Sequence, residues 1–163
     1  MRHRETKGKL TITISHQRAM GRNLVGSLFD RGQVVTTMAK AKAFRPFAER
    51  LITLARRGNR RKEDGTPEGR AAYLHAVRRA AQLLPFRPSV RTLFDKVAPA
   101  VGERPGGYTR IVRLAKPRLG DNALRVLFML VDKPKPPEAE ASPGKGEIKA
   151  AKPPRKKAAA ATR

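Results

Sequence analysis

Apolar residues recur with the period of an α-helix near the start of the chain. From Met20 to Leu28 every fourth residue is apolar, which places these side chains on one face of a helix. Ser15 is a candidate N-cap for this helix, and Gly32 is positioned to end it. The β-branched run that follows, 33–37, predicts a strand.

A second apolar pattern of helical spacing runs from Ala41 to Ala55 and continues to Gly58. Pro46 falls inside this pattern, where a proline removes a backbone donor and is expected to bend the helix. The next segment, 58–70, combines glycine and proline with many charged residues, so we expect an exposed loop there.

Thr66, followed by Pro67 and Glu68, is typical of a helix start. Apolar residues then repeat at intervals of three and four until Pro85 stops the run. A shorter helix is expected next, with its apolar positions within 90–97.

Two β-like runs, 108–114 and 124–131, close this part of the chain and are joined by the basic turn 116–123. The predicted order is therefore helix, strand, three helices and a hairpin. This order favours a fold that mixes helices and strands (α/β), and within it the α+β arrangement.

Composition changes sharply after residue 133. The last segment, 134–163, holds six Pro, eight Ala and eight Lys plus Arg, with Ile148 as its one large aliphatic residue. Such a segment buries too little apolar surface to offset the entropy of ordering it. We expect a folded domain over 1–133, with an extended basic start at 1–14, and a disordered basic tail over 134–163.

The charge balance points to an anionic partner. The chain has 163 residues with 37 Lys plus Arg against 13 Asp plus Glu, which gives a formal charge of +24. It contains no cysteine, which excludes disulfide scaffolds and thiolate-bound metals. The longest apolar run, Val126 to Val131, is far shorter than the roughly 20 residues of a bilayer-spanning helix. No secretory signal follows the basic start, so a cytoplasmic protein is expected.

Catalytic chemistry has little support in the sequence. No carboxylate pair is placed for acid and base work, and His3, His16 and His75 share no ligand spacing. No glycine-rich phosphate loop follows a predicted strand. We expect no enzymatic activity, no cofactor and no small-molecule substrate.

Basic residues instead concentrate at several places, as a nucleic-acid-binding surface requires. Arg18 and Arg22 lie one turn apart on the first predicted helix and should point the same way. Tyr108 opens a strand and has two open interpretations, stacking on a base or sugar and packing across the sheet. For His16 two roles stay open, namely an RNA contact and a local structural role.

Several of these residues lie in sequence stretches that resemble the family of bacterial large-subunit ribosomal protein seventeen. The matching stretches follow the family's order over about the first 132 residues: MRHR at 1–4, SHQRAMGRNL at 15–24, VTTMAKAK at 35–42, LITLA at 51–55, GGYTRI at 106–111 and GDNA at 120–123. Each stretch alone is weak, but the ordered set is highly specific.

The resemblance implies a two-layer fold with a small three-stranded mixed sheet and a function without catalysis. It also implies that 1–133 is a ribosomal-protein domain that contacts the long RNA of the large subunit. Proteins of this family lie around the exit of the nascent-chain tunnel, near other ribosomal proteins. No membrane partner is expected.

The family motifs and the basic clusters together give the expected RNA-binding residues. These are Arg2, His3, Arg4, Lys7, Lys9, His16, Arg18, Arg22, Asn23, Thr36, Thr37, Lys40, Lys42, Arg56, Arg57, Arg60, Arg61, Tyr108, Thr109, Arg110, Lys116 and Arg118. Three departures from the family pattern stand out. Gln17 intervenes between the motif histidine and its arginine, 10–14 alternates like a strand, and about eleven residues near 62–72 look inserted.

Two other functions compete with this one. A nucleoid or histone-like DNA-binding protein also carries a tail rich in Lys, Ala and Pro, but no recognition helix or dimer-forming repeat is visible here. An RNA-modifying enzyme would need the catalytic constellation that the sequence lacks.

Overall fold

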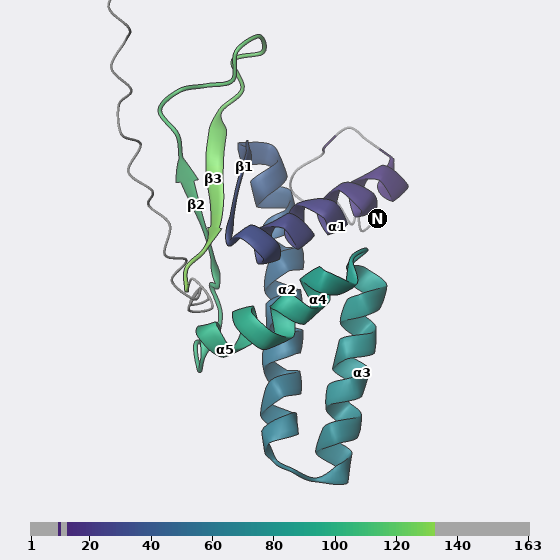
Figure 1. The fold of residues 1–163 in the computed structure, drawn as a ribbon. Coiled ribbons are helices and arrows are strands. Elements are labelled where there is room, and N and C mark those ends of the chain that lie inside the picture. Colours follow the sequence, from purple (N-terminus) through teal and green to yellow (C-terminus); the bar gives the residue numbers. More distant parts are fainter. Residues whose placement is uncertain (1–9, 11–12, 133–163) are drawn as a thin grey trace, which may run out of the picture.

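The computed structural model describes residue 10 and residues 13–132 of the chain. Residues 1–9 and 11–12 of the predicted basic start and the segment 134–163 lie outside these residues, so the predicted domain boundary and the predicted tail stay predictions. The last residues of the start, Thr13 and Ile14, form the N-cap and first residue of α1 and are not extended chain. The elements in chain order are α1 (Ile14–Arg31), β1 (Gln33–Thr37), α2 (Met38–Glu63), α3 (Pro67–Leu83), α4 (Arg87–Thr92), the π-helical segment η1 (Leu93–Val97), α5 (Ala98–Val101), β2 (Thr109–Arg113) and β3 (Arg125–Leu130) (Figure 1). This is the predicted α+β order of helix, strand, helices and hairpin.

The three strands form one sheet in the order β1-β3-β2, and both pairs are antiparallel. Phe128 at the centre of β3 lies opposite Val34 on one side and Ile111 on the other. The predicted mixed sheet is therefore wrong. β3 lies between the other two strands and runs against both, so the two strands that share a direction never pair.

Helices cover one face of the sheet and make the second layer (Figure 1). Alternate residues of β3, namely Val126, Phe128 and Leu130, are almost completely buried, because side chains along a strand point to opposite faces. They join side chains of α1, α2 and the helical stretch 87–101 in one core. The largest fully buried side chains of the described residues include Tyr108, Phe29, Phe128, Leu28, Leu51, Ile52 and Leu93.

The first helix ends where the sequence predicts but begins earlier. Gly32 has φ 73°, and its N–H donates to the carbonyl of Leu28 at 2.8 Å, as in a left-handed helix cap. Ser15 lies inside the first turn, and Thr13 occupies the N-cap position without a side-chain hydrogen bond. The last residue of the strand-like segment 10–14 is not part of a strand, because Ile14 is the first residue of α1.

The predicted exposed loop over 58–70 is mostly helical. α2 runs through Pro46 and past Gly58 to Glu63, and α3 starts at Pro67. Gly58 is buried because α3 and η1 pack against it. A Cβ at this position would lie 3.0 Å from Cβ of Ala76 and 3.3 Å from the ring of Phe94.

The start of α3 agrees with the sequence prediction. The Thr66 hydroxyl accepts a 3.0 Å hydrogen bond from the backbone N–H of Gly69, and Pro67 occupies the first turn. α2 and α3 thus form a tight helical hairpin (Figure 1). The predicted shorter helix is confirmed as the continuous stretch 87–101, in which η1 separates α4 from α5.

Candidate nucleic-acid interface

Many of the carboxylates of the described part of the chain are occupied by internal contacts. Four ion pairs join its residues: Arg45–Glu49, Arg91–Asp95, Arg104–Asp132 and Arg118–Asp121. Glu49 also accepts from the Thr109 hydroxyl at 3.0 Å, and Asp30 accepts from the Ser89 hydroxyl at 2.8 Å. Because acids are scarce and many of them are engaged, the exposed basic side chains keep most of their charge available for a partner.

The first group of predicted site residues lies on α1. His16, Arg18 and Asn23 are exposed, and Arg22 is half-buried. Arg18 and Arg22 both line a groove of about 470 Å³ between α1 and α2, as their spacing of one turn requires. The sequence prediction that these two side chains act together is thus consistent with their position.

The second group follows β1 into α2. Thr36 pairs with Val126 in the sheet, and Thr37 occupies the N-cap position of α2. Both threonines are half-buried. Lys40 is half-buried and Lys42 exposed on the first turns of α2. Of this group Lys42 is the most available to a partner.

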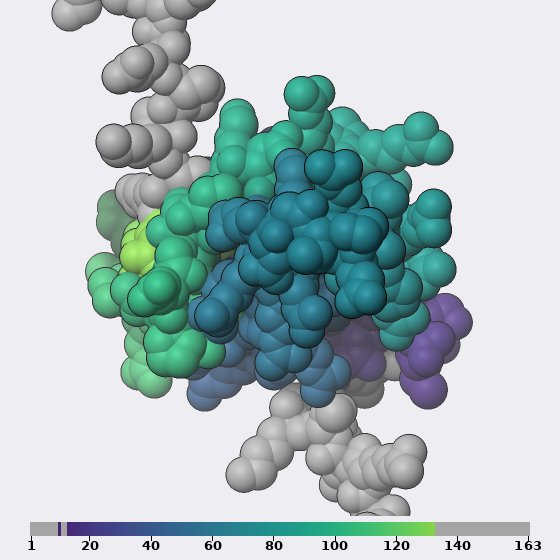
Figure 2. All heavy atoms as spheres, turned by 90° about the horizontal axis from the view of Figure 1, so that it is seen from below, coloured from purple at the N-terminus to yellow at the C-terminus, as the bar shows by residue number. Residues whose placement is uncertain are grey.

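The third group lies on the helical hairpin of α2 and α3, which Figure 2 views from its closed end. Arg57, Arg60 and Arg61 are exposed and line an open groove of about 660 Å³ together with His75 of α3 and one carboxylate, that of Asp64. Arg56 has a different position, because its guanidinium donates to the backbone carbonyl of Arg104 and ties α2 to the loop after α5. It acts within the fold.

Tyr108 and Thr109 are turned into the protein. Tyr108 is 1% exposed, and its hydroxyl donates to the carbonyl of Pro105 at 3.4 Å. Thr109 is 3% exposed and donates to Glu49. Of the two interpretations of Tyr108, the structure supports packing, because a buried ring has no face open to a base. Arg110, the next residue, is exposed.

The basic turn between β2 and β3 is held by one ion pair. Nε of Arg118 lies 2.9 Å from Oδ1 of Asp121, and Nη2 contacts the second carboxylate oxygen. The hydrogen bonds from Arg118 and from the backbone N–H of Ala123 lower the pKa of Asp121 to about 2 from its usual 3.8. Lys116, in the same turn, is exposed.

These groups are spread over the molecule. The β2–β3 turn and the closed end of the α2–α3 hairpin lie at opposite ends of the fold (Figure 1). Arg2, His3, Arg4, Lys7 and Lys9 lie outside the described residues. The arrangement is suited to a partner that meets the protein on several sides.

Sequence reasoning missed two side chains that accompany the predicted ones. His75 joins the arginines of α2 because α3 packs alongside it, and Gln17 joins Arg18 and Arg22 in their groove. The pairing of α2 with α3 was hidden by the predicted loop between them. For Gln17 the spacing on α1 gave a usable signal, because Gln17 lies one turn before Gly21, which lines the same groove.

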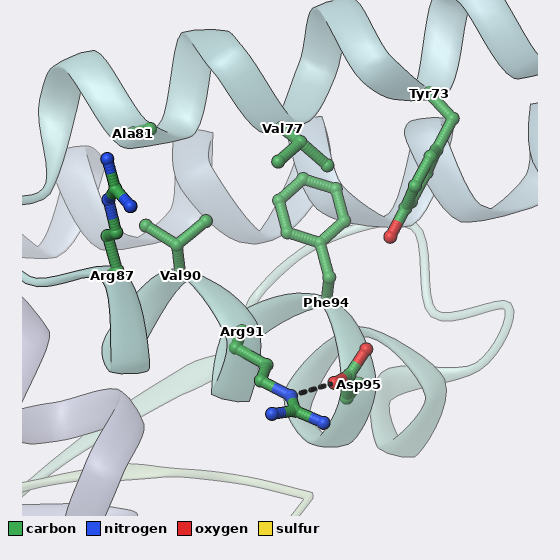
Figure 3. A pocket seen from close by; sticks show the side chains of 8 residues that line it. All are labelled: Tyr73, Val77, Ala81, Arg87, Val90, Arg91, Phe94 and Asp95. Carbon is green, nitrogen blue, oxygen red and sulfur yellow. Dashed lines mark hydrogen bonds and ion pairs between the residues drawn. The ribbon is translucent and has the colours of Figure 1, made fainter.

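A further groove, between α3 and the stretch α4–η1, is mainly apolar (Figure 3). Phe94 lies under Val77. The rings of Tyr73 and Phe94 meet edge to face, with 5.5 Å between their centroids. Arg91 on its rim pairs with Asp95 at 3.3 Å, and Arg87 lines the same groove without taking part in the ion pairs that join described residues.

No helix in the described part of the chain is both long and apolar enough to span a bilayer. Residues 13–132 also contain no group of three or more histidine and carboxylate side chains that could hold a metal ion.

Comparison with known proteins gives a consistent result. The model of the family described as ribosomal protein L17 matches residues 20–131. A large ribosomal subunit protein bL17 of Akkermansia muciniphila is 42% identical over 135 residues, covering 83% of this chain and 88% of that protein. The bL17 protein of Geobacter metallireducens is 39% identical and covers 99% of this chain and 83% of its own length. That of Trichlorobacter lovleyi is 40% identical, covering 85% of this chain and all of its own length.

Proposed function

The chain belongs to the ribosomal protein L17 family, and from this membership we propose that its exposed basic side chains bind large-subunit ribosomal RNA close to the exit of the nascent-chain tunnel. The chain is a structural, non-enzymatic protein of the large ribosomal subunit. Its RNA contacts, and the residues that make them, are what we propose.

The observation that carries the proposal is the imbalance of available charge. In the described residues, carboxylates are held by Arg45, Arg91, Arg104 and Arg118 or by hydroxyl groups, whereas the other basic side chains greatly outnumber the remaining acids. Each phosphate that a lysine or arginine neutralises releases bound counterions, which favours binding at moderate salt. A rigid body with such charge on several sides stabilises RNA where helices converge.

The proposed contact residues are those that the fold leaves accessible. Within the described chain they are His16, Arg18, Arg22, Asn23, Lys40, Lys42, Arg57, Arg60, Arg61, Arg110 and Lys116. Arg118 is accessible too, but its guanidinium is held by Asp121. Tyr108, Thr109 and Arg56 support the fold beneath them. The basic start at 1–9 is proposed to extend the RNA contact, as the family resemblance implies.

The place near the tunnel exit, with other ribosomal proteins as neighbours, rests on the family resemblance. Crosslinking tests it directly. We would tag the chain in its own cell, isolate large subunits on a sucrose gradient and map the crosslinked RNA positions by sequencing. Crosslinks around the tunnel exit are expected, and crosslinks confined to another face of the subunit would contradict the proposed location.

The residue assignment needs a separate test with matched charge. The double variant Arg18→Glu and Arg22→Glu is expected to enter large subunits poorly. Its control, Arg78→Glu with Arg79→Glu, changes the net charge equally at exposed positions of α3 outside the proposed set. Equal incorporation of both variants, or an equal loss, would contradict a specific role for α1.

A further inference from the structure

The groove between α1 and α2 has walls of two kinds. Phe44 and Phe47 of α2 and Leu83 at the end of α3 supply apolar surface. Arg18 and Arg22 of α1 supply the charge on the other side. Figure 1 shows how this arises, since α1 crosses α2 while the last turn of α3 ends beneath the N-terminal half of α1.

Close packing at one point forms the floor of the groove. Gly21 lies directly over Phe44, whose ring is 5% exposed, and a Cβ on Gly21 would approach that ring to 2.8 Å. Phe47, one turn further along α2, is only half-buried and presents part of its ring to the groove. The groove is therefore an aromatic surface that solvent can reach.

The charge in this groove is not balanced by the residues around it. The lining residues include no aspartate or glutamate, and the ion pairs that join described residues do not involve Arg18 or Arg22. In the groove of Figure 3, by contrast, Asp95 neutralises Arg91. An occupant of the α1–α2 groove must therefore bring both an apolar face and negative charge.

We propose that this groove binds one unpaired nucleotide of RNA, with the base against Phe47 and the flanking phosphates on Arg18 and Arg22. The inference rests on the proposed RNA-binding function and specifies what its α1 site takes. An unpaired base is a flat apolar surface bonded to a phosphate backbone, and RNA-binding proteins hold such bases on aromatic rings and guanidinium planes.

Size and polarity agree with this occupant. A groove of about 470 Å³ lies within the usual range of ligand sites, roughly 300 to 1,000 Å³. Gln17 lines the same groove, and its amide has both a donor and acceptor for a base edge. A paired RNA helix presents its phosphates but no free base, so it would leave the aromatic wall uncovered.

The test compares two RNA hairpins of equal length, one fully paired and one with a single bulged nucleotide, by fluorescence anisotropy with the full chain. The unaltered protein is expected to bind the bulged hairpin more tightly. Phe47→Leu should weaken that binding about tenfold, the order expected on losing one base–aromatic stack, and leave the paired hairpin unaffected. Ala43→Met, which extends a side chain from the wall into the groove, should have the same selective effect.

The matched control is Phe86→Leu, because Phe86 is 57% exposed and lies outside this groove. It should keep the preference for the bulge. Gln17→Ala provides a groove variant that removes no core contact, and it should also reduce the preference. Thermal melting of each variant separates a binding loss from unfolding.

The outcomes distinguish a failure of the nucleotide site from a failure of the proposed RNA-binding function. Equal binding of both hairpins by the unaltered protein, or a preference that Phe47→Leu, Ala43→Met and Gln17→Ala all preserve, would overturn the nucleotide site and leave RNA binding intact. The groove would then be open to a protein neighbour. Failure to bind either RNA more tightly than a DNA duplex of the same length would instead contradict the proposed function.

Discussion

The hydroxyl of Ser89 donates a 2.8 Å hydrogen bond to Oδ2 of Asp30, joining α4 to the last turn of α1 across 59 positions of sequence. Ser89 is completely buried, whereas Asp30 lies at the surface. The contact holds α1, which carries Arg18 and Arg22, against the helical stretch 87–101. The RNA-binding surface proposed for α1 therefore depends on a polar contact within the fold.

Ser89→Ala is expected to lower the free energy of unfolding by about 1.5–3 kcal/mol, as for other hydrogen bonds to charged groups. Urea denaturation followed by circular dichroism measures the change. Asp30→Asn is the control, because the amide keeps an acceptor oxygen and should cost less. A larger loss for Asp30→Asn than for Ser89→Ala would contradict the role assigned to the pair.

Glycine substitutions test the close packing of the helices. Gly69→Ala is expected to destabilise the protein by about 1–3 kcal/mol, because its Cβ would lie 2.1 Å from the backbone carbonyl oxygen of Arg61. Gly26→Ala is the matched control within a helix. Its Cβ would meet no atom closer than the Ser89 hydroxyl at 3.5 Å, and alanine favours helix by up to about 1 kcal/mol. Thermal melting should therefore show opposite shifts, and equal losses would contradict the packing.

The ion pair in the β2–β3 turn predicts a pH effect of known sign. The pKa of Asp121 is lowered to about 2, so the pair stabilises the turn fully above the usual value of 3.8 and is lost as the pH falls towards 2. Arg118→Gln should move the pKa of Asp121 back towards 3.8, as carboxyl carbon NMR would show. Arg113→Gln, on β2, should leave it unchanged. An unaltered titration in the Arg118 variant would contradict the pairing.

Most of the fold follows from local sequence patterns. Gly32 ends α1, Thr66 caps α3, and the β-branched run 33–37 forms β1, because each feature depends on residues adjacent in the chain. The prediction of a loop from Gly58 onward is wrong for a different reason. Glycine is a poor helix former, but here tertiary packing against Ala76 and Phe94 outweighs that local preference.

The candidate site could be predicted only in part. Helical spacing was enough to place Arg18 and Arg22 on one face, which the groove between α1 and α2 confirms. Burial could not be read from spacing, and so Tyr108 was considered both as a stacking surface and as a core residue. Its position depends on how the hairpin docks on the helices, which distant residues determine.

The salt dependence of RNA binding should distinguish free from neutralised arginines. Arg60→Gln with Arg61→Gln removes two exposed guanidiniums, and none of the ion pairs between described residues involves either. If each neutralises one phosphate, the slope of log affinity against log salt should become shallower by about 1.4–1.8. Arg118→Gln should change the slope by much less, because Asp121 already neutralises Arg118. Titrations of a fragment of large-subunit RNA at several salt concentrations provide the slopes. Similar slope changes per arginine in the two variants would show that internal ion pairs do not decide which side chains bind RNA, and would remove the main argument for the proposed surface.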